Sequence, residues 1–242
     1  MNSVTNTSVS IVDEPNDDIE QVALAIPDYL QEVYHWAYLD ERNARWLDRE
    51  WVVATILWGN AKRLRQAVLA QVEAGDHVLQ VAHVYGKLIP ELAKQVGKTG
   101  ALEVIDIAPL QASRCQSKLE GFANSNVRIA DASVLTEGSY DLVDCFFLLH
   151  EVPDELKIKI VHALLSQVAP GGKVIFVDYH QPHRWHPLRQ FMQFIFRHLE
   201  PFAEGLLHQT IKDMAGGVGS FTWLTRTLFG GLYQVTIATR PI

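Results

Sequence analysis

Apolar runs alternate with amphipathic segments along the middle of the chain. Five runs rich in apolar residues predict strands, at 77–82, 101–107, 127–130, 140–148 and 173–179. Helices are predicted between them at 87–96, from Pro109 onward and at 154–168, the last closed by Pro170-Gly171-Gly172. This alternation predicts an α/β fold with a parallel sheet and right-handed crossovers.

Two further segments, 221–229 and 232–239, flank Gly230-Gly231, which favours a β-hairpin. Five parallel strands followed by an antiparallel pair are the layout of the Rossmann-like class I S-adenosylmethionine-dependent methyltransferase fold. We therefore expect a methyltransferase-like core formed by residues 73–182 and 220–242. The polar, acidic residues 1–25 are expected to form a disordered leader.

Residues 26–72 contain two predicted helical segments, about 27–48 and 51–71. They hold four of the six tryptophans, at positions 36, 46, 51 and 58. These aromatic residues are compatible with a helical cap over a pocket and equally with an ordinary helix pair packed on a sheet.

A second helical insertion is expected at 183–219. One face of this predicted helix carries Leu188, Phe191, Met192, Ile195, Leu199 and Phe202, whereas Phe194 and Phe196 fall on the other side. Arg184, Arg189 and Arg197 make the segment locally basic. Two interpretations remain open: an amphipathic helix that covers the sheet, or a surface that contacts anionic lipid and faces a substrate or a membrane.

The formal net charge of −7 argues against a nucleic-acid partner, which would need a basic surface. The chain start lacks the pattern of a signal peptide, and no window has the roughly eighteen apolar residues of a membrane span. Cys115 and Cys145 are expected as buried free thiols in a reducing compartment. We expect a cytoplasmic protein, peripheral on the inner membrane.

The turn after the first predicted strand lacks most of the glycines of a nucleotide-binding turn. In residues 78–86 only Gly86 is retained, and Gln80, Ala82 and Val84 occupy other positions where glycines or an acid are usual. Such a turn receives an adenosine cofactor in doubly wound folds. We expect S-adenosylmethionine to contact this turn through Gln80, Ala82, Tyr85 and Gly86.

Two aspartates are placed to bind the same cofactor. Asp106 ends the second predicted strand about twenty residues after Gly86, the spacing at which a carboxylate meets ribose hydroxyls. Asp131, followed by Ala132, comes just after the third strand and could accept from an adenine amino group. The alternative for Asp131 is a simple helix cap.

Polar side chains also follow the fourth and fifth strands. His150 and Glu151 come after one strand, and Asp178, Tyr179 and His180 end the next, at the sheet edge where ligands bind. We expect catalytic roles among these five residues. Asp178 and His180 offer the oxygen and nitrogen ligands that suit Mn²⁺ or Mg²⁺, although the spacing matches no standard metal motif and an imidazole could instead be a general base.

The chain resembles the rhodoquinone biosynthesis proteins, a methyltransferase-like family, over about residues 26–240. The resemblance rests on Ile56-Leu57-Trp58-Gly59-Asn60, on Val78-Leu79-Gln80-Val81-Ala82 through Val84-Tyr85-Gly86, on Phe146-Phe147-Leu148-Leu149-His150-Glu151, on Val177-Asp178-Tyr179-His180 and on Trp185-His186-Pro187-Leu188. It implies that ubiquinone is converted to rhodoquinone by replacing a ring methoxy group with an amino group. It further implies S-adenosylmethionine as the amino donor and a divalent metal, manganese, as an assistant.

That resemblance suggests a reason for the altered turn. An ammonium ion cannot attack a ring carbon, and we hypothesise that the neutral Gln80 keeps the cofactor's amine uncharged. A metal on Asp178 or His180 would polarise a quinone carbonyl, and His150 would shuttle the released proton. An ordinary methyltransferase acting on a quinone or small aromatic is the first alternative, and a non-catalytic quinone-binding accessory protein is the second.

Overall fold

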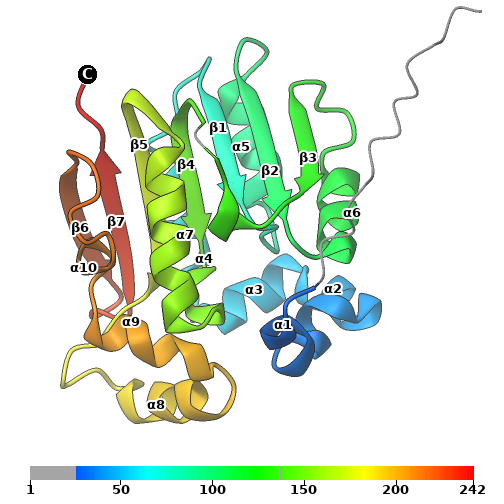
Figure 1. Cartoon of the computed structure of the whole chain (residues 1–242). Helices are drawn as coiled ribbons and strands as arrows, with labels where there is room; N and C mark the ends of the chain where they lie inside the picture. Colours follow the sequence, from blue (N-terminus) through cyan, green and yellow to red (C-terminus); the bar gives the residue numbers. More distant parts are fainter. Residues whose placement is uncertain (1–25, 137) are drawn as a thin grey trace, which may run out of the picture.

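A seven-stranded sheet forms the centre of the computed structural model, which describes residues 26–136 and 138–242 (Figure 1). The strands are β1 (His77–Val81), β2 (Ala101–Asp106), β3 (Ser125–Ile129), β4 (Tyr140–Phe146), β5 (Val168–Tyr179), β6 (Thr222–Leu228) and β7 (Tyr233–Thr239). Their order is β3-β2-β1-β4-β5-β7-β6. Strands β1 to β5 are parallel, and β7 is antiparallel to both β5 and β6. The predicted fold class is confirmed, including the C-terminal hairpin. The predicted leader lies outside the described residues.

Helices cover both faces of the sheet. The described residues form the helices α1 (Asp28–Glu32), α2 (Glu41–Leu47), α3 (Glu50–Ile56), α4 (Ala61–Leu69), α5 (Leu88–Val96), α6 (Pro109–Lys118), α7 (Asp154–Ser166), α8 (Arg189–His198), α9 (Glu204–His208) and α10 (Ile211–Met214). On one face α4 and α5 bury residues such as Leu64 and Leu92 against the sheet. On the other face α7 buries Leu164 against Phe176. No helix of the described residues is long and apolar enough to cross a membrane.

The N-terminal region is more broken than the two predicted helices. It contains α1, a π-helical turn (His35–Leu39), α2, α3 and α4. Asp40 starts a new helix because its side chain accepts a hydrogen bond of 2.8 Å from the backbone N–H of Asn43. Trp58 and Gly59 have positive φ angles of 50° and 75°, which a helix cannot continue through. Helices α1, α2 and α3 lie below the strand ends in Figure 1, whereas α4 packs against the sheet.

The junction between α7 and β5 also differs from the prediction. The helix ends at Ser166, and residues 168–172, with the Pro-Gly-Gly sequence, already belong to β5. The pairing of β4 with β5 shifts register between Tyr140 and Leu142. Gly172 permits this irregularity, because an added Cβ would lie 2.9 Å from the carbonyl oxygens of Tyr140 and Asp141.

Helix α8 packs on the core through part of its predicted apolar face, Leu188, Met192 and Ile195, and also through Phe196. Met192 and Phe196 are buried, whereas Phe191, Phe194 and Leu199 are about half exposed. Phe196 was placed on the opposite side by the helical pattern, and this was wrong. Phe196 follows Met192 by four residues, so the helical period places the two side chains side by side on the face that packs over the strand ends.

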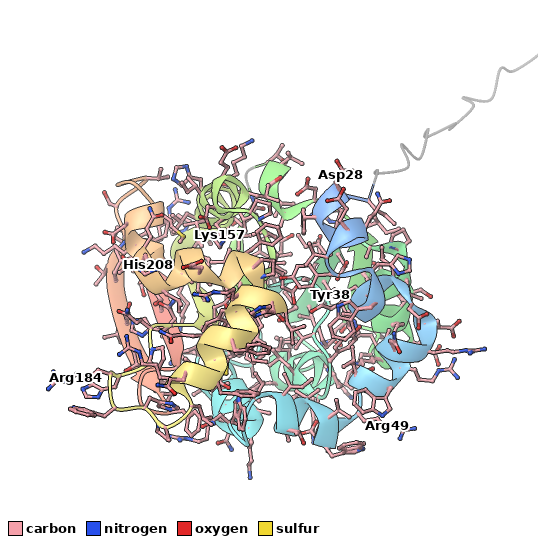
Figure 2. All side chains as sticks on the ribbon, turned by 90° about the horizontal axis from the view of Figure 1, so that it is seen from below. Asp28, Tyr38, Arg49, Lys157, Arg184 and His208 are labelled. Atoms are coloured by element: carbon pink, nitrogen blue, oxygen red, sulfur yellow. The ribbon has the colours of Figure 1, made fainter. Side chains whose placement is uncertain are left out.

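Lys157 joins the insertion to α7. Its fully buried ammonium group donates to the carbonyl oxygens of Val152 (2.9 Å) and Phe202 (2.7 Å) and pairs with Asp154 (2.5 Å). Figure 2 shows Lys157 beneath the insertion helices. The lysine therefore satisfies backbone oxygens that come from two separate segments.

We expect Lys157→Met to lower the free energy of unfolding by about 1–3 kcal/mol, because it leaves these buried carbonyl groups without a donor. Urea denaturation would measure the change. The control is Lys159→Met, two residues away and exposed. Equal stability of the two variants would show that Lys157 does not hold the insertion.

Candidate active site

A cavity of about 540 Å³ lies where the carboxyl ends of β1, β2, β4 and β5 meet the N-terminal helices and α8. The strand ends contribute Ala82, Asp106 and His150, and the N-terminal helices contribute Tyr38 and other aromatic side chains. Most of the surface is apolar, and the polar groups cluster at a few points. This is the usual composition of a small-molecule site.

The turn after β1 keeps the backbone shape of a cofactor turn without the usual glycines. Ala82 has φ = 66°, in the left-handed region that favours glycine. The next backbone N–H, of His83, donates to Asp106 Oδ2 at 2.7 Å, and Ala108 N–H donates to Oδ1 at 2.8 Å. Asp106 therefore ties the turn to the end of β2 and lines the cavity.

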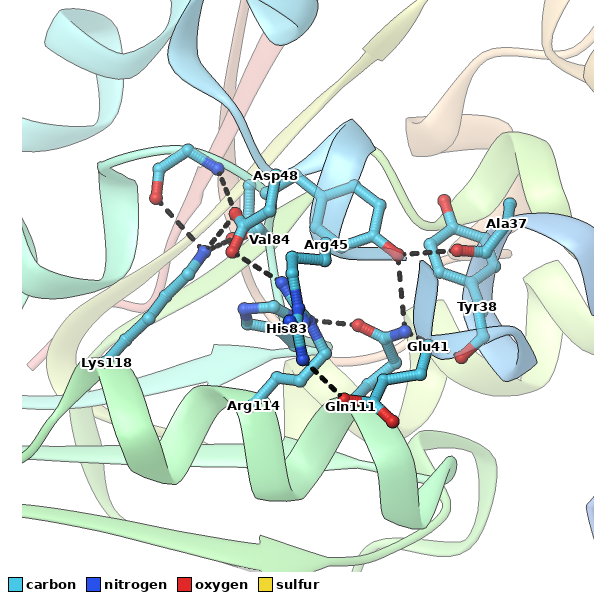
Figure 3. Close-up of polar contacts among 12 residues, drawn as sticks. Ala37, Tyr38, Glu41, Arg45, Asp48, His83, Val84, Gln111, Arg114 and Lys118 are labelled. Carbon is cyan, nitrogen blue, oxygen red and sulfur yellow. Dashed lines mark hydrogen bonds and ion pairs between the residues drawn. The ribbon is translucent and has the colours of Figure 1, made fainter. Parts of the chain in front are cut away.

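Asp48, the residue that ends α2, fixes the N-terminal helices onto this turn (Figure 3). Its carboxylate accepts from Gly86 N–H (2.8 Å), Lys118 Nζ (2.5 Å) and Arg114 (3.0 Å). Lys118 also donates to the carbonyl oxygens of Val84 and Gly86, both at 3.1 Å. The two cations of α6 and the carboxylate of α2 thus hold the turn from both sides.

A second polar group sits on the other side of the turn in Figure 3. Gln111 donates to Tyr38 O (2.6 Å) and to the Tyr85 hydroxyl (3.2 Å), which itself donates to Ala37 O. The Gln111 side-chain oxygen is consequently left to accept from His83 Nδ1 at 2.9 Å. Burial and the nearby Lys118 lower the pKa of His83 to about 3, so its imidazole is neutral.

Asp178 and His150 form a buried pair at the ends of β5 and β4. Asp178 accepts from the backbone N–H groups of Leu149 (2.9 Å) and Tyr179 (2.7 Å), and a longer contact of 3.3 Å joins it to His150 N–H. Its Oδ1 also lies 2.9 Å from His150 Nδ1. Donors surround this carboxylate, which therefore accepts from Nδ1 and leaves Nε2 as the nitrogen on the cavity side.

Two glutamates face His150 Nε2, at 3.6 Å from Glu151 Oε1 and 3.9 Å from Glu200 Oε2. Burial by itself lowers the pKa of His150, but Asp178, Glu200 and Glu151 raise it to a net value of about 9. Burial raises the pKa of Glu151 to about 8 and also raises that of Glu200. At neutral pH this cluster therefore holds protons that it can give to a ligand.

Tyrosines of the N-terminal helices complete the cluster. The Tyr34 hydroxyl donates to Glu200 at 2.8 Å, and the Tyr38 hydroxyl donates to Glu151. Tyr34 and Tyr38 are four residues apart and lie 6.1 Å apart between ring centroids. The two tyrosines of the N-terminal segment thus donate hydrogen bonds to the two glutamates across the cavity lining.

The structure brings most of the predicted site residues to the cavity. Its lining includes Ala82, Tyr85, Asp106, Asp131, Ala132, His150, Glu151 and Tyr179, whereas Gln80, Gly86, Asp178 and His180 are not part of it. Asp131 also caps the short helix 132–134 by accepting from Ser133 N–H at 2.8 Å. Both interpretations of Asp131 are therefore compatible with its position. The roles of all these residues remain predictions.

Gln80 lies in the sheet and not at the cavity surface. It is fully buried, and its amide nitrogen donates to the carbonyl oxygens of Val81 (3.0 Å) and Ala82 (3.2 Å). The hypothesis that Gln80 contacts the cofactor amine therefore needs correction. Its hydrogen bonds shape the turn instead.

The predicted metal ligands Asp178 and His180 do not converge. Asp178 is occupied by backbone N–H groups and His150, while His180 Nδ1 faces the carbonyl oxygens of Gly231 (2.9 Å) and Gln181 (3.1 Å). Within residues 26–136 and 138–242, no group of three or more His, Cys, Asp or Glu side chains is arranged to hold a metal ion. The residues present do not fit the expected manganese, and the metal-ligand prediction is corrected.

Sequence reasoning missed Glu200, Tyr34, Tyr38 and Asp48. Glu200 is an isolated acid between the apolar Leu199 and Pro201, at the end of an otherwise apolar and basic helix. The Tyr34–Tyr38 spacing of four residues places two hydroxyls on one helical face. Both signals are visible in the sequence, but neither identifies a partner in the other segment.

The strand order, the cofactor-type turn and the cavity at the carboxyl ends of the strands together define a Rossmann-like methyltransferase fold. The chain belongs to the ubiE/COQ5 methyltransferase family, whose model matches residues 56–226. The N-methyltransferase NodS from Bradyrhizobium japonicum, in complex with S-adenosyl-L-homocysteine, has a similar fold. The TM-score is 0.59 and the identity 13%, over 89% of this chain and 100% of that one.

Curated relatives carry names from quinone biosynthesis. A ubiquinone biosynthesis O-methyltransferase of Vibrio parahaemolyticus is 29% identical over 143 residues, 57% of this chain and 58% of that protein. A ubiquinone/menaquinone biosynthesis C-methyltransferase UbiE of Idiomarina loihiensis is 31% identical over 117 residues, 46% and 45% of the two chains. The matched region thus spans about half the length of these relatives.

The Asp178–His150 pair generates a prediction about protonation. We expect Asp178→Asn to lower the pKa of His150 from about 9, because the variant removes the nearest negative charge that favours the imidazolium ion. NMR titration of the imidazole would measure it, with His150→Gln assigning the signal. An unchanged pKa in Asp178→Asn would contradict this account.

The same shift has a sign for stability. The pKa of His150 is raised above its ordinary value of 6.5, so its contribution to stability is complete below pH 6.5 and is lost as the pH rises towards about 9. We expect His150→Gln to flatten the pH dependence of unfolding in this window. His208→Gln, in an exposed side chain, is the control.

Proposed function

We propose that the protein is an S-adenosylmethionine-dependent transferase of quinone biosynthesis, and that it replaces a ring methoxy group of ubiquinone with an amino group to make rhodoquinone. The observation that carries the proposal is the buried cluster on the wall of an apolar cavity, in which His150 Nε2 lies 3.6 Å from Glu151 and 3.9 Å from Glu200. Family membership supports the cofactor and the quinone pathway. The resemblance in the turn and in the Asp178-Tyr179-His180 segment supports the amino transfer.

The site fits S-adenosylmethionine at the strand ends. Asp106 lies at the end of β2, where a carboxylate can accept from ribose hydroxyls, and Asp131 with Ala132 lies at the end of β3. The left-handed backbone of Ala82 lets the turn approach a ligand as a glycine would. When bound, the cofactor would supply the amino nitrogen, the methoxy group would leave as methanol, and the bond between that nitrogen and the cofactor's α-carbon would also have to break, a step assigned to none of the described residues.

Proton donors suit a quinone better than a phenol. A nucleophile that adds to a quinone ring places negative charge on a ring oxygen, and a methoxy group that leaves also needs a proton. His150 and Glu151 lie 3.6 Å apart on the cavity wall and the pKa of each is raised, so the pair holds a proton at neutral pH and is placed to act as the general acid for these oxygens. Asp178 keeps the imidazole oriented through Nδ1. No step is assigned to a metal.

An ordinary methyl transfer is the second candidate, and the names of the relatives favour it. Methylation of a phenol requires a base to remove the phenolic proton. In that reaction a carboxylate, for example ionised Glu200, would have to accept the proton. Burial raises the pKa of the acids in this cluster, so a smaller fraction of the carboxylate is ionised at neutral pH. The non-catalytic accessory alternative differs from both reactions, because it requires no chemical change in the quinone.

Mass spectrometry of the quinone after incubation with ubiquinone and S-adenosylmethionine tests the proposal. We expect a lighter product, with methoxy replaced by amino, and a product heavier by one methylene would establish methyl transfer instead. Parallel reactions with added Mn²⁺ and with a chelator determine whether a metal is needed. An unchanged quinone under all conditions would contradict the amino transfer, whereas methyl transfer is tested by offering a hydroxyl-bearing quinone precursor in the same assay.

The face around the cavity mouth is apolar and basic, which supports a membrane as the source of the quinone. Trp58 and Phe191, in edge contact at 5.5 Å between centroids, line the cavity and are also exposed. Trp185 is 76% exposed with Arg184 5.0 Å from its ring centroid. Figure 2, the view from below, shows Arg49 and Arg184 on opposite sides of this face.

We propose that this face lies on an anionic bilayer of the inner membrane, on its cytoplasmic side. The basic residues are local to it, whereas the whole chain carries a net charge of −7. Aromatic residues with arginines beside them bind the interface of a membrane, and the charge contribution weakens as salt screens it. A lipid-soluble quinone would then enter the cavity without passing through water.

Sedimentation with phosphatidylglycerol vesicles tests this surface. We expect Trp185→Ser to reduce the bound fraction several-fold, since a buried aromatic side chain contributes about 1.5–3 kcal/mol. Leu224→Ser, at an exposed position of the edge strand β6, is the matched control. Binding that is insensitive to both Trp185→Ser and salt would contradict a membrane-binding role of this face.

A further inference from the structure

Two buried polar side chains in neighbouring strands have oxygen atoms without a hydrogen-bond partner among the described residues. They are Gln80 of β1, through Oε1, and Asp144 of β4, through both carboxyl oxygens. Both residues have no solvent exposure. Such atoms are rare in folded proteins, because an unpaired buried polar group is costly.

Gln80 and Asp144 are direct neighbours in the sheet. They are register partners in the parallel β1–β4 pair, where strands lie about 4.8 Å apart. The residues that precede them in the two strands, Leu79 and Val143, belong to the core on the α7 face. Side chains alternate along a strand, so Gln80 and Asp144 both point to the other face, beneath α4 and α5.

The surroundings of Asp144 are apolar. Leu142 and Phe146 flank it on the same face of β4, and Ile175 is its register partner in β5. Burial is the cause of the raised pKa of Asp144, and no charged side chain of the described residues contributes to it. The nearest titratable residue along β4, Cys145, points to the opposite face. An ionised carboxylate here would lack any counter-charge, at a cost of several kcal/mol.

We propose that Asp144 is a positioning residue: as a neutral carboxylic acid it donates its hydroxyl hydrogen to Gln80 Oε1. The protonated acid has the one donor that the amide oxygen lacks. This hydrogen bond orients the Gln80 amide, whose nitrogen then holds the carbonyl oxygens of Val81 and Ala82. Asp144 therefore supports the left-handed turn at Ala82 from inside the sheet.

The pair also explains why position 80 carries an amide. A glutamate there could not donate to the two carbonyl oxygens, and it would stand beside a second acid in the same apolar environment. Two such carboxyls would have to share a proton. Cofactor turns usually carry an acid near the end of the first strand. In this chain that position is Gln80, and an acid, Asp144, lies beside it in the adjacent strand. The link to cofactor affinity rests on the proposed function, whereas the pairing itself does not.

The first measurement is infrared spectroscopy of the folded protein at neutral pH. We expect the C=O stretch of a protonated carboxyl group that disappears in both Asp144→Asn and Asp144→Leu. Other buried acids such as Glu151 also contribute, so Glu151→Gln serves as the control and should leave the Asp144 band in place. Absence of a band assigned to Asp144 would overturn the proposal.

Calorimetry with S-adenosylmethionine separates positioning from stability. Asparagine can still donate to Gln80 Oε1, so Asp144→Asn should bind the cofactor like the wild type. Asp144→Leu leaves Oε1 unpaired, and we expect about tenfold weaker binding, the effect of losing one buried donor. Its melting temperature should fall modestly, because the buried Oε1 loses its donor, so the affinities are compared at a temperature where both variants are folded. Wild-type affinity in Asp144→Leu would overturn the role.

Hydrogen exchange distinguishes failure of this inference from failure of the proposed function. If the wild type binds no S-adenosylmethionine, the proposed function is contradicted, but the pairing is still tested at the turn. We then expect faster exchange of the Ala82 and His83 amides in Asp144→Leu than in Asp144→Asn. Equal exchange in the two variants would overturn the proposal independently of any cofactor.

Discussion

The ion pair between Asp48 and Lys118 is the contact on which the cavity depends. Asp48 belongs to the N-terminal helices, and Lys118 to α6 of the core, yet both are bonded to the backbone of the same turn. Together with the hydrogen bonds of Gln111, Tyr34 and Tyr38, this contact fixes the aromatic helices at the strand ends. A turn whose conformation is normally set by glycines is here held by charged side chains of two other segments.

Burial determines the chemistry of the cavity wall. Burial disfavours charge on Glu151 and Glu200, whereas the more deeply buried Asp178 is surrounded by N–H donors. His150 lies between Asp178 and the glutamates, and the acids on both sides favour its protonated, positively charged form. Tyr34 and Tyr38 connect this network to the N-terminal helices, so the protonation of Glu151 and Glu200 and the position of these helices are linked.

The fold could be predicted from the sequence because each parallel strand is a short apolar run with its own boundaries. The strand-end rule also pointed to Asp106, Asp131 and His150, which line the cavity, since it depends only on where a strand stops. It could not resolve which neighbouring residue faces inward: Tyr179 lines the cavity, whereas Asp178 turns to the backbone of residues 149 and 150. The direction of the Gln80 side chain was equally ambiguous, and it is buried in the sheet rather than exposed at the cavity. Glu200 and Asp48 were out of reach because they act across segments that only the tertiary fold brings together.

The contact between Trp58 and Phe191 has a consequence for selectivity. It joins two segments more than 130 positions apart at the cavity mouth, and the space behind it is limited to about 540 Å³. That space suits a cofactor together with a ring, and a long isoprenoid chain would extend past the aromatic rim. Under the proposed function, the protein would select its quinone by the substituents of the ring and accept tails of different lengths.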